Sequence, residues 1–234
     1  MSDKHLSTQF DAELSAISTR VLEMGGLVEH QVSLAVEALA EFSEEKATDV
    51  IRTEQRVNQF ELEIDRDLSN IIARRQPTAR DLRLLIGVSK TIGNLERVGD
   101  EAARIARTVH RLVANGTHGR LFPTTQMSFE ATLATASLRS ALDAFARLDA
   151  NQAMNVIKHD GEIDAEFDGL MRKLVTYMME DPRTISASID LVFVAKSLER
   201  VGDHAKNLAE QVIYIAKGAD VRHTPVDGLE SAVS

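Results

Sequence analysis

The hexapeptide Leu-Glu-Arg-Val-Gly-Asp occurs twice in this chain of 234 residues, at 95–100 and again at 198–203. Each copy continues into an alanine-rich stretch, Glu101-Ala-Ala-Arg-Ile-Ala106 in the first and His204-Ala-Lys-Asn-Leu-Ala209 in the second. A motif that recurs with similar surroundings indicates an internal duplication. The chain is therefore expected to fold as two similar halves.

Both copies of the hexapeptide hold two acidic residues four positions apart, Glu96 with Asp100 and Glu199 with Asp203. On a helix this spacing places the two carboxylates on the same face. Two like charges in this position repel each other by about 0.2–0.5 kcal/mol unless a cation lies between them. The repeated pair therefore predicts a bound cation or a cationic partner.

The composition indicates an all-α protein. Apolar residues make up 44% of the chain and charged residues 27%, which is ordinary for a globular protein. There is no tryptophan and there are only four prolines, while the residues that favour long helices, Ala, Leu, Glu and Arg, are abundant. We therefore expect helices and no sheet.

Charge and cysteine content exclude several kinds of function. The net charge is −9 and no stripe of Lys and Arg stands out, so binding to nucleic acid is not expected. The absence of cysteine excludes disulfides and thiolate metal sites. The N-terminus lacks the pattern of a signal peptide and no stretch approaches 18 apolar residues. A cytoplasmic protein without membrane insertion is the prediction.

Apolar residues recur at steps of three and four along most of the chain, which is the period of amphipathic helices. Breaks at Gln76-Pro77 and Asp181-Pro182 separate some of these stretches, and Thr78 is a candidate N-cap. A polar stretch with two glycines and a proline, residues 115–123, is the candidate linker. Six helices are expected, at about residues 10–42, 44–75, 78–110, 128–148, 151–179 and 184–217.

These helices predict two tandem three-helix bundles related by the internal duplication, at residues 5–115 and 121–218, followed by a flexible tail at 219–234. The Gly25-Gly26 pair in the first helix could mark a bend or a close helix approach, and small residues at a crowded helix crossing are the favoured interpretation.

Counting outward from the proline breaks places further polar residues opposite each repeated acid pair. Glu54 lies 22 residues before position 76, and the middle of the segment 96–100 lies 22 residues after it. Asp160 and Asp164 lie 22 and 18 residues before Pro182, while the segment 199–203 lies 17 to 21 after it. Since consecutive helices joined by a tight turn run antiparallel, these groups should face each other.

The expected metal ligands are therefore four oxygen-bearing side chains in each half: Glu54, Asn58, Glu96 and Asp100 in the first, and Asp160, Asp164, Glu199 and Asp203 in the second. Oxygen ligands without cysteine suit Mg²⁺, Mn²⁺, Ca²⁺ or iron rather than a structural zinc. No Glu-x-x-His pair accompanies these acids, which disfavours redox chemistry of the ferritin type. Because Asn58 replaces an acid, the second site is expected to bind a cation more tightly.

Other polar residues receive a simpler interpretation. A helical wheel places Glu96 and Asp100 on a flank of the core stripe, where a single acid pair would ordinarily be a solvated face. Arg97 and Arg200 are expected to be solvated, and His204, which is not duplicated, to be a surface residue. No nucleophile elbow, phosphate loop or Ser/His/Asp order is present, so no catalytic residue is assigned.

Several motifs together resemble the PhoU family of phosphate-transport accessory proteins. They are the two Glu-Arg-Val-Gly-Asp copies, the Arg74-Arg-Gln-Pro-Thr-Ala-Arg-Asp-Leu-Arg83 segment, Met24-Gly-Gly26 and Thr176-Tyr-Met-Met-Glu-Asp181. The resemblance extends from about residue 10 to 223 and is close to the proteobacterial members.

The resemblance implies two three-helix bundles, a role beside the Pst phosphate transporter and negative regulation of the phosphate-starvation (Pho) regulon. It implies an adaptor, not an enzyme, that links the transporter's ATPase subunit to the PhoR sensor kinase. A homo-oligomer, as a dimer, is also expected. Some members of the family bind metal clusters at their acidic motifs. The expected cofactor is thus a divalent or trivalent metal ion (Mg, Mn, Fe or Zn), and its identity stays open.

Three hypotheses remain: a signalling adaptor with metal-organised surfaces, a carboxylate-bridged helical metalloenzyme, and a helical interaction protein without metal. An enzyme should have a polar pocket with an open coordination position and a titratable base, whereas an adaptor should carry its carboxylates on an exposed flank. The flank position of the acid pairs favours the adaptor.

Overall fold

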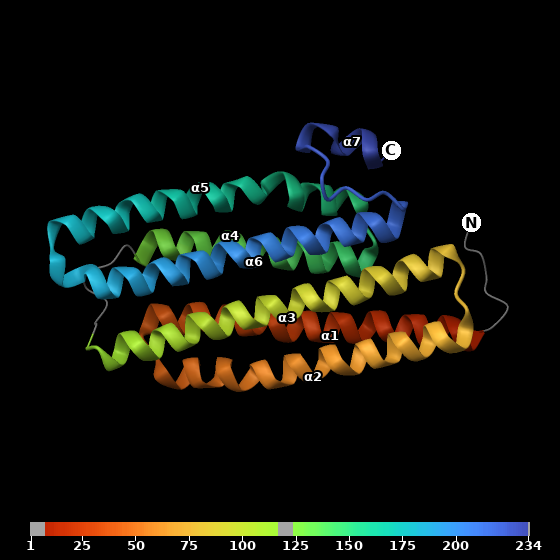
Figure 1. Cartoon of the computed structure of the whole chain (residues 1–234), viewed down its shortest axis with the longest axis horizontal. Helices are drawn as coiled ribbons and strands as arrows, with labels where there is room; N and C mark the ends of the chain where they lie inside the picture. The colour runs from red at the N-terminus through yellow and green to blue at the C-terminus, as the bar shows by residue number, and fades with distance from the viewer. Residues whose placement is uncertain (1–7, 117–123, 234) are drawn as a thin grey trace.

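The computed structural model describes residues 8–116 and 124–233, and these residues form helices without any strand (Figure 1). The predicted all-α fold is confirmed. Of the linker expected at 115–123, residues 117–123 lie outside the described residues. Residues 5 and 121, where the two predicted bundles begin, also lie outside them. The elements are α1 (Thr8–Glu41), α2 (Glu44–Arg75), α3 (Ala79–Ala114), α4 (Thr124–Arg147), α5 (Ala150–Glu180), η1 (Pro182–Thr184), α6 (Ile185–Lys217), η2 (Val226–Gly228) and α7 (Leu229–Val233).

The connection between the first and second helix has the same conformation and the same kind of cap in both halves. Phe42 between α1 and α2, and Leu148 between α4 and α5, both take a left-handed conformation with φ near 50° (52° and 50°). Each is followed by a residue that caps the next helix: Ser43 accepts a hydrogen bond from the Lys46 amide, and Asp149 does the same for two amides of α5. A polar N-cap satisfies amide groups that the first helical turn leaves without partners.

The second turn of each half lies at the predicted proline. Gln76 takes a left-handed conformation before Pro77, and Pro182 begins the short η1 helix. Thr78 does occupy the N-cap position of α3, but its hydroxyl donates to the Asp81 carboxylate (2.8 Å) instead of accepting from a backbone amide. A proline at either turn lacks the amide hydrogen that a continuing helix needs.

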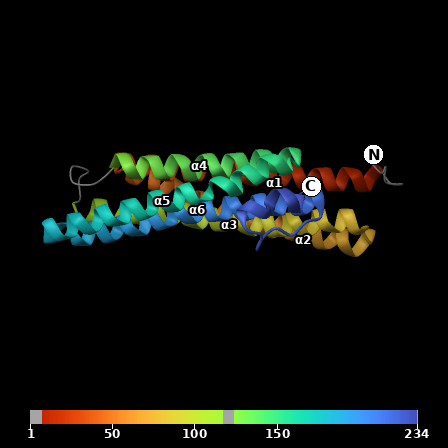
Figure 2. The ribbon, with the colours of Figure 1, turned by 90° about the horizontal axis from the view of Figure 1, so that it is seen from above.

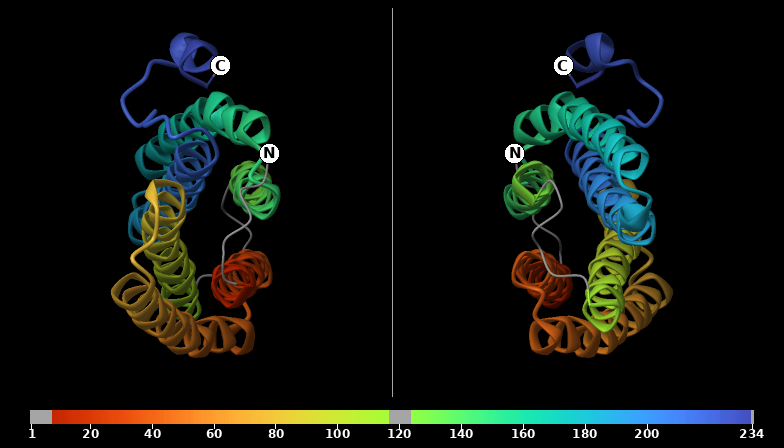
Figure 3. Two further views of the ribbon diagram at one scale, coloured as in Figure 1. Left: turned by 90° about the vertical axis from the view of Figure 1, so that its right-hand side faces the viewer. Right: turned by 90° about the vertical axis from the view of Figure 1, so that its left-hand side faces the viewer.

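Each half is a bundle of three long antiparallel helices, and the two bundles lie side by side along their length (Figures 1 and 2). Viewed end on, α3 lies against α6 and α1 lies beside α4 (Figure 3). The buried apolar residues of all six long helices form a single continuous core. The halves are therefore distinct in topology but share one core.

Close helix crossings explain several glycines. A Cβ atom at Gly25 of α1 would lie 2.4 Å from Leu142 of α4, whereas one at Gly26 would meet nothing within 4 Å. The predicted close approach at this pair is thus confirmed for Gly25 and places it between the halves. In the repeated hexapeptides, a Cβ at Gly99 would lie 3.3 Å from Val57 and one at Gly202 would lie 2.6 Å from Ile163. The repeated motif therefore includes the residue that lets neighbouring helices approach.

The segment after α6 was expected to be flexible, but part of it packs on the second bundle. Gly218 ends α6 in a left-handed conformation with φ of 77°. Beyond it, Val221 and Leu229 are buried, and α7 contacts α5, where the Lys158 ammonium lies 2.6 Å from the Glu230 carboxylate. Burial of two apolar side chains holds this segment against the bundle.

None of the helices in the described ranges is both long enough and apolar enough to cross a membrane.

Candidate functional site

The register predicted between the second and third helix of each half is confirmed. In the first half, the Arg107 guanidinium of α3 lies 2.6 Å from the Glu54 carboxylate of α2. In the second half, the Lys206 ammonium of α6 lies 2.6 Å from the Asp160 carboxylate of α5. A Cβ atom at Gly99 would lie 3.3 Å from Val57, and one at Gly202 would lie 2.6 Å from Ile163. Residues 54–58 therefore face residues 96–100, and residues 160–164 face residues 199–203.

Three of the four residues predicted for the first site come together. Burial raises the pKa of Glu96, and the neighbouring Asp100 raises it further. Burial likewise raises the pKa of Asp100, with an added effect from Glu54. Asn58 is exposed to solvent, and none of the interactions found among the described residues links it to the cluster. The asparagine therefore belongs to the rim and not to the cluster.

The sequence interpretation missed an acid in this group. Glu61 of α2 has a pKa raised by burial and by the charges of Asp65 and Asp100, and it also raises the pKa of Glu96. Glu61 lies seven residues after Glu54, a spacing that keeps both on one face of α2, so the same wheel could have found it. We define the first acid cluster as Glu54, Glu61, Glu96 and Asp100.

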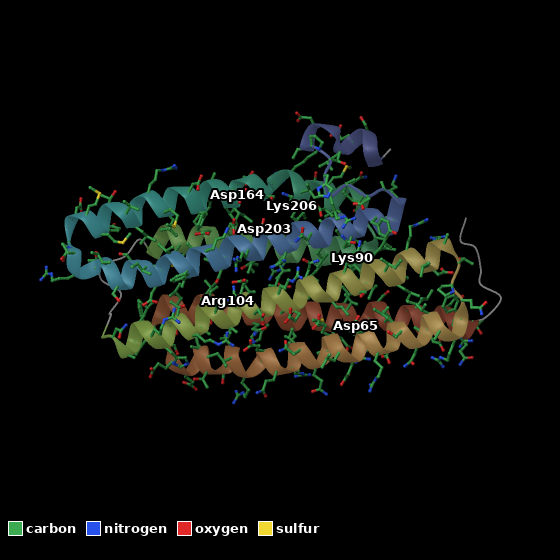
Figure 4. All side chains as sticks on the ribbon, viewed as in Figure 1. Asp65, Lys90, Arg104, Asp164, Asp203 and Lys206 are labelled. Atoms are coloured by element: carbon green, nitrogen blue, oxygen red, sulfur yellow. The ribbon has the colours of Figure 1, made fainter. Side chains whose placement is uncertain are left out.

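All four residues predicted for the second site come together, and we call them the second acid cluster: Asp160, Asp164, Glu199 and Asp203. Burial raises the pKa of Asp203, and the charges of Glu199, Asp160 and Asp164 raise it further. The pKa of Asp164 is raised by burial and then by Asp160 and Glu199. Asp164, Asp203 and Lys206 are labelled together over α5 and α6 in Figure 4.

Two lysines, which the sequence interpretation did not consider, lie within the second acid cluster. Lys206 contacts Asp160, and the Lys196 ammonium lies 2.6 Å from the Glu199 carboxylate. The charge count that favoured the second site therefore changes in two ways. Glu61 adds a fourth acid to the first cluster, and two ammonium groups already neutralise part of the second. Tighter cation binding by the second site no longer follows from charge.

A buried acid extends the second cluster into the core. Glu130 of α4 is completely buried, and neither of its carboxylate oxygens has a hydrogen-bond partner among the described residues. Burial, followed by the charges of Glu199 and Glu166, raises the pKa of Glu130 to about 8. One oxygen of Glu199 is also buried without a partner there. Glu130 lies on the apolar stripe of Ala131, Ala134 and Leu138, and an acid in such a stripe is the sequence signal that could have revealed this buried carboxylate.

The donor chemistry of both clusters suits a hard metal ion, because burial and then mutual repulsion raise carboxylate pKa values that a cation would lower. The present conformations of these side chains are less suitable for binding a metal ion. Within the described ranges, no group of three or more His, Asp or Glu side chains is arranged to hold a metal ion. Ion binding at either cluster would thus require these side chains to change their rotamers.

Polar groups also lie between the two halves, where α3 meets α6. Glu101 is only 4% exposed and accepts hydrogen bonds from Ser197 (2.8 Å), Arg104 (2.8 Å) and Arg200 (3.2 Å). Arg97 and Arg200 are exposed as predicted. His204, predicted to be a surface residue, is half-buried: it lies 3.1 Å from the Asn94 side chain, and burial, then the Arg97 charge, lowers its pKa.

Comparison with known proteins places this arrangement in a family. A family model described as the PhoU domain matches residues 21–109 and 130–212, once in each half. The chain is 47% identical over 223 residues to a protein of Burkholderia sp named phosphate-specific transport system accessory protein PhoU homolog, covering 95% of both chains. It is 42% identical to the Escherichia coli K12 protein named phosphate-specific transport system accessory protein PhoU, covering 99% of this chain and 95% of that protein.

Two solved structures share the fold. The crystal structure of PhoU from Pseudomonas aeruginosa matches with a TM-score of 0.86 and 44% identity, covering 89% of this chain and 99% of that one. The structure of a phosphate transport system regulatory protein PhoU from Streptococcus pneumoniae matches with a TM-score of 0.83 and 28% identity, covering 91% and 99%. The arrangement of two bundles is thus shared over nearly the full length of both.

Proposed function

This chain belongs to the PhoU family, and from that premise we propose that it is an accessory protein of a phosphate-specific transport system and a negative regulator of the phosphate-starvation response. The observation that carries the proposal is the likeness to the E. coli accessory protein over 99% of the chain. A match of this extent includes both bundles and both acid clusters. It therefore concerns the whole molecule and not one shared module.

We propose that the protein acts as an adaptor in the cytoplasm, between the ATPase subunit of the Pst transporter and the PhoR sensor kinase, and as a homodimer. When phosphate is plentiful, the adaptor would keep the kinase from activating its response regulator. The long outer faces of the helices offer extended surfaces for two partners (Figure 1). Acids on half-buried flanks, several of them already paired with lysine or arginine, suit a binding role better than catalysis.

The acid clusters are proposed as cation sites that support this adaptor role. Each gathers four carboxylates from two neighbouring helices, and burial, followed by repulsion from the neighbouring acids, raises the pKa of Glu96 and of Asp203. A bound Mg²⁺, Mn²⁺, iron or Zn²⁺ ion would offset that repulsion and join the two helices. Binding is expected to be modest, because the clusters lie partly in contact with water.

Deletion of the gene in its host tests the regulatory proposal. Alkaline phosphatase activity in phosphate-rich medium should rise when the gene is deleted and fall again when the intact chain is supplied from a plasmid. A plasmid encoding residues 1–116 alone is a suitable control, because each half shares its core with the other. Unchanged phosphatase activity in the deletion strain would contradict the regulatory role.

A further inference from the structure

A row of large apolar side chains is exposed on the first half of α6. Ile185, Ile189 and Phe193 are 41%, 45% and 59% exposed, and they follow one another at intervals of four residues. This spacing places them along one face of the helix over about 12 Å. Single exposed apolar residues are ordinary, whereas a row along one helix face is typical of a surface that receives another protein segment.

The row leads into a groove of about 460 Å³ between α3 and α6, which Phe193 helps to line. The charged residues of this groove are mostly basic. Arg104, which is labelled in Figure 4, lies on its α3 side. The basic residues of the lining are Arg104, Arg107, Arg111, Lys196 and Arg200, and its acidic residue is Glu101.

This concentration of positive charge stands out in a protein whose net charge is −9. The groove is defined by these basic residues, Glu101, Phe193 and two hydroxyl side chains. Glu101 accepts hydrogen bonds from Ser197, Arg104 and Arg200, so it offsets part of the charge of the two arginines. The side chains of Arg104 and Arg200 are 52% and 44% exposed, whereas that of Glu101 is 6% exposed. A ligand in the groove would therefore meet mainly guanidinium and ammonium groups.

The groove cations already have acidic partners. Arg107 pairs with Glu54 and Arg111 with Asp190, and both arginine side chains remain about half exposed, at 46% and 52%. The acids are only 19% and 13% exposed, so these pairs stay in place. A guanidinium group has five N–H donors, more than one carboxylate uses, and an incoming carboxylate can bind the remaining ones.

We propose that this groove and the adjoining row bind an acidic amphipathic segment of a protein partner. The apolar face of such a segment would lie on Ile185, Ile189 and Phe193, and its carboxylates would pair with the arginines of α3. The apolar row extends along α6 beyond the groove, which fits a helix better than a small anion. This inference rests on the proposed adaptor role, because the partner would be the transporter ATPase or the sensor kinase.

Binding of the full-length protein to the purified ATPase subunit and to the cytoplasmic part of the kinase, measured by biolayer interferometry, tests this inference. The variants are Phe193→Ser and the double change Arg107→Gln with Arg111→Gln. Matched controls on α2 are Leu62→Ser, since Leu62 is 70% exposed, and Arg52→Gln, since Arg52 is 75% exposed. Unchanged helical circular dichroism would show that each variant is folded.

We expect each groove variant to weaken binding to one partner at least tenfold, and each control to change it less than twofold. Binding of the wild type should also weaken as salt is raised from 50 to 500 mM, because the contact is between charges. A synthetic alanine-based 16-residue helix with leucines at four-residue intervals along one face and glutamates on the opposite face should compete with the partner, and its counterpart with lysines in place of the glutamates should not.

The outcomes separate this proposal from the adaptor role itself. If the wild type binds a partner and the groove variants bind it equally well, the groove is not the docking surface. If Phe193→Ser alone weakens binding and neither salt nor the arginine changes matter, the segment is not acidic, and the proposal is overturned. If the wild type binds neither partner, the adaptor role fails and this inference fails with it.

Discussion

The Glu101 carboxylate of α3 accepts a hydrogen bond from the Ser197 hydroxyl of α6 at 2.8 Å, and both residues are only 4% exposed between the two halves of the molecule. Arg200 of α6 adds a second link to the same carboxylate. The junction of the bundles is thus not purely apolar. It holds one acid whose hydrogen-bond partners come from both halves.

Replacing Glu101 with Ala should destabilise the protein by about 1–3 kcal/mol, because the change leaves the buried Ser197 hydroxyl without its acceptor and removes the contacts to Arg200 and Arg104. Urea unfolding followed by circular dichroism measures this. Ser197→Ala should cost only about 1 kcal/mol, since it removes a single neutral hydroxyl. Equal stability of wild type and Glu101→Ala would show that the polar link contributes nothing to the packing of the halves.

The glycine of the second hexapeptide should not tolerate a side chain. Gly202→Ala would place a Cβ atom 2.6 Å from Cδ1 of Ile163, and overpacking of this kind costs about 1–3 kcal/mol. Ile163→Val removes that Cδ1 atom, so the double variant should recover much of the loss. Thermal unfolding of the two single variants and the double variant forms the test. The absence of any recovery would indicate that another contact, and not Ile163, limits the space at this crossing.

Glu130 should make stability depend on pH. Its pKa is raised from 4.5 to about 8, so the folded state favours the protonated form. The group's contribution to stability is therefore complete below its unfolded pKa and is lost as pH rises through the folded pKa of about 8. Unfolding free energies measured from pH 5 to 9 should fall over this window in the wild type.

Met24 in the first half is equivalent in position to Glu130 in the second half, so methionine is the replacement that we choose for Glu130. Both residues lie 18 positions before the left-handed residue that follows their helix, Phe42 in the first half and Leu148 in the second. Glu130→Met should therefore fit the core and stabilise the protein by about 2–4 kcal/mol at pH 8. The gain should shrink toward pH 5. A gain of the same size at every pH would mean that Glu130 does not titrate in this range.

Removing the lysines of the second acid cluster should strengthen its binding of Mn²⁺. Lys196→Met combined with Lys206→Met leaves Glu199 and Asp160 without their ammonium partners, and we expect about a tenfold gain in affinity by calorimetry. Lys46→Met is the control, because Lys46 pairs with Glu37 and Glu41 away from both clusters.

The same titration tests the clusters as cation sites. Glu199→Ala with Asp203→Ala should abolish Mn²⁺ binding at the second cluster, and Glu96→Ala with Asp100→Ala should abolish it at the first. Helical circular dichroism should stay nearly unchanged, because these changes remove repulsion between like charges. A wild-type protein that binds no Mn²⁺ at millimolar concentration would contradict the proposal for both clusters.

Local signals are enough to place the long helices, the two proline turns and the register inside each half. These signals are the three- and four-residue steps of apolar side chains and the prolines at 77 and 182. Because antiparallel helices joined by a short turn must align by length, counting from that turn was enough to place Glu54 opposite the first hexapeptide and Asp160 opposite the second.

How the two halves meet, and which charges neutralise the acids, depends on contacts between residues that are far apart in the sequence. The contact of α3 with α6 joins residues almost 100 positions apart, such as Glu101 and Ser197, and no local pattern specifies such a pairing. The sequence contains Lys196 and Lys206, but a lysine side chain is long and flexible, so its ion-pair partner can be identified only from the three-dimensional structure. The burial of Glu130 depends on packing by other helices, and this packing alone raises its pKa to about 8.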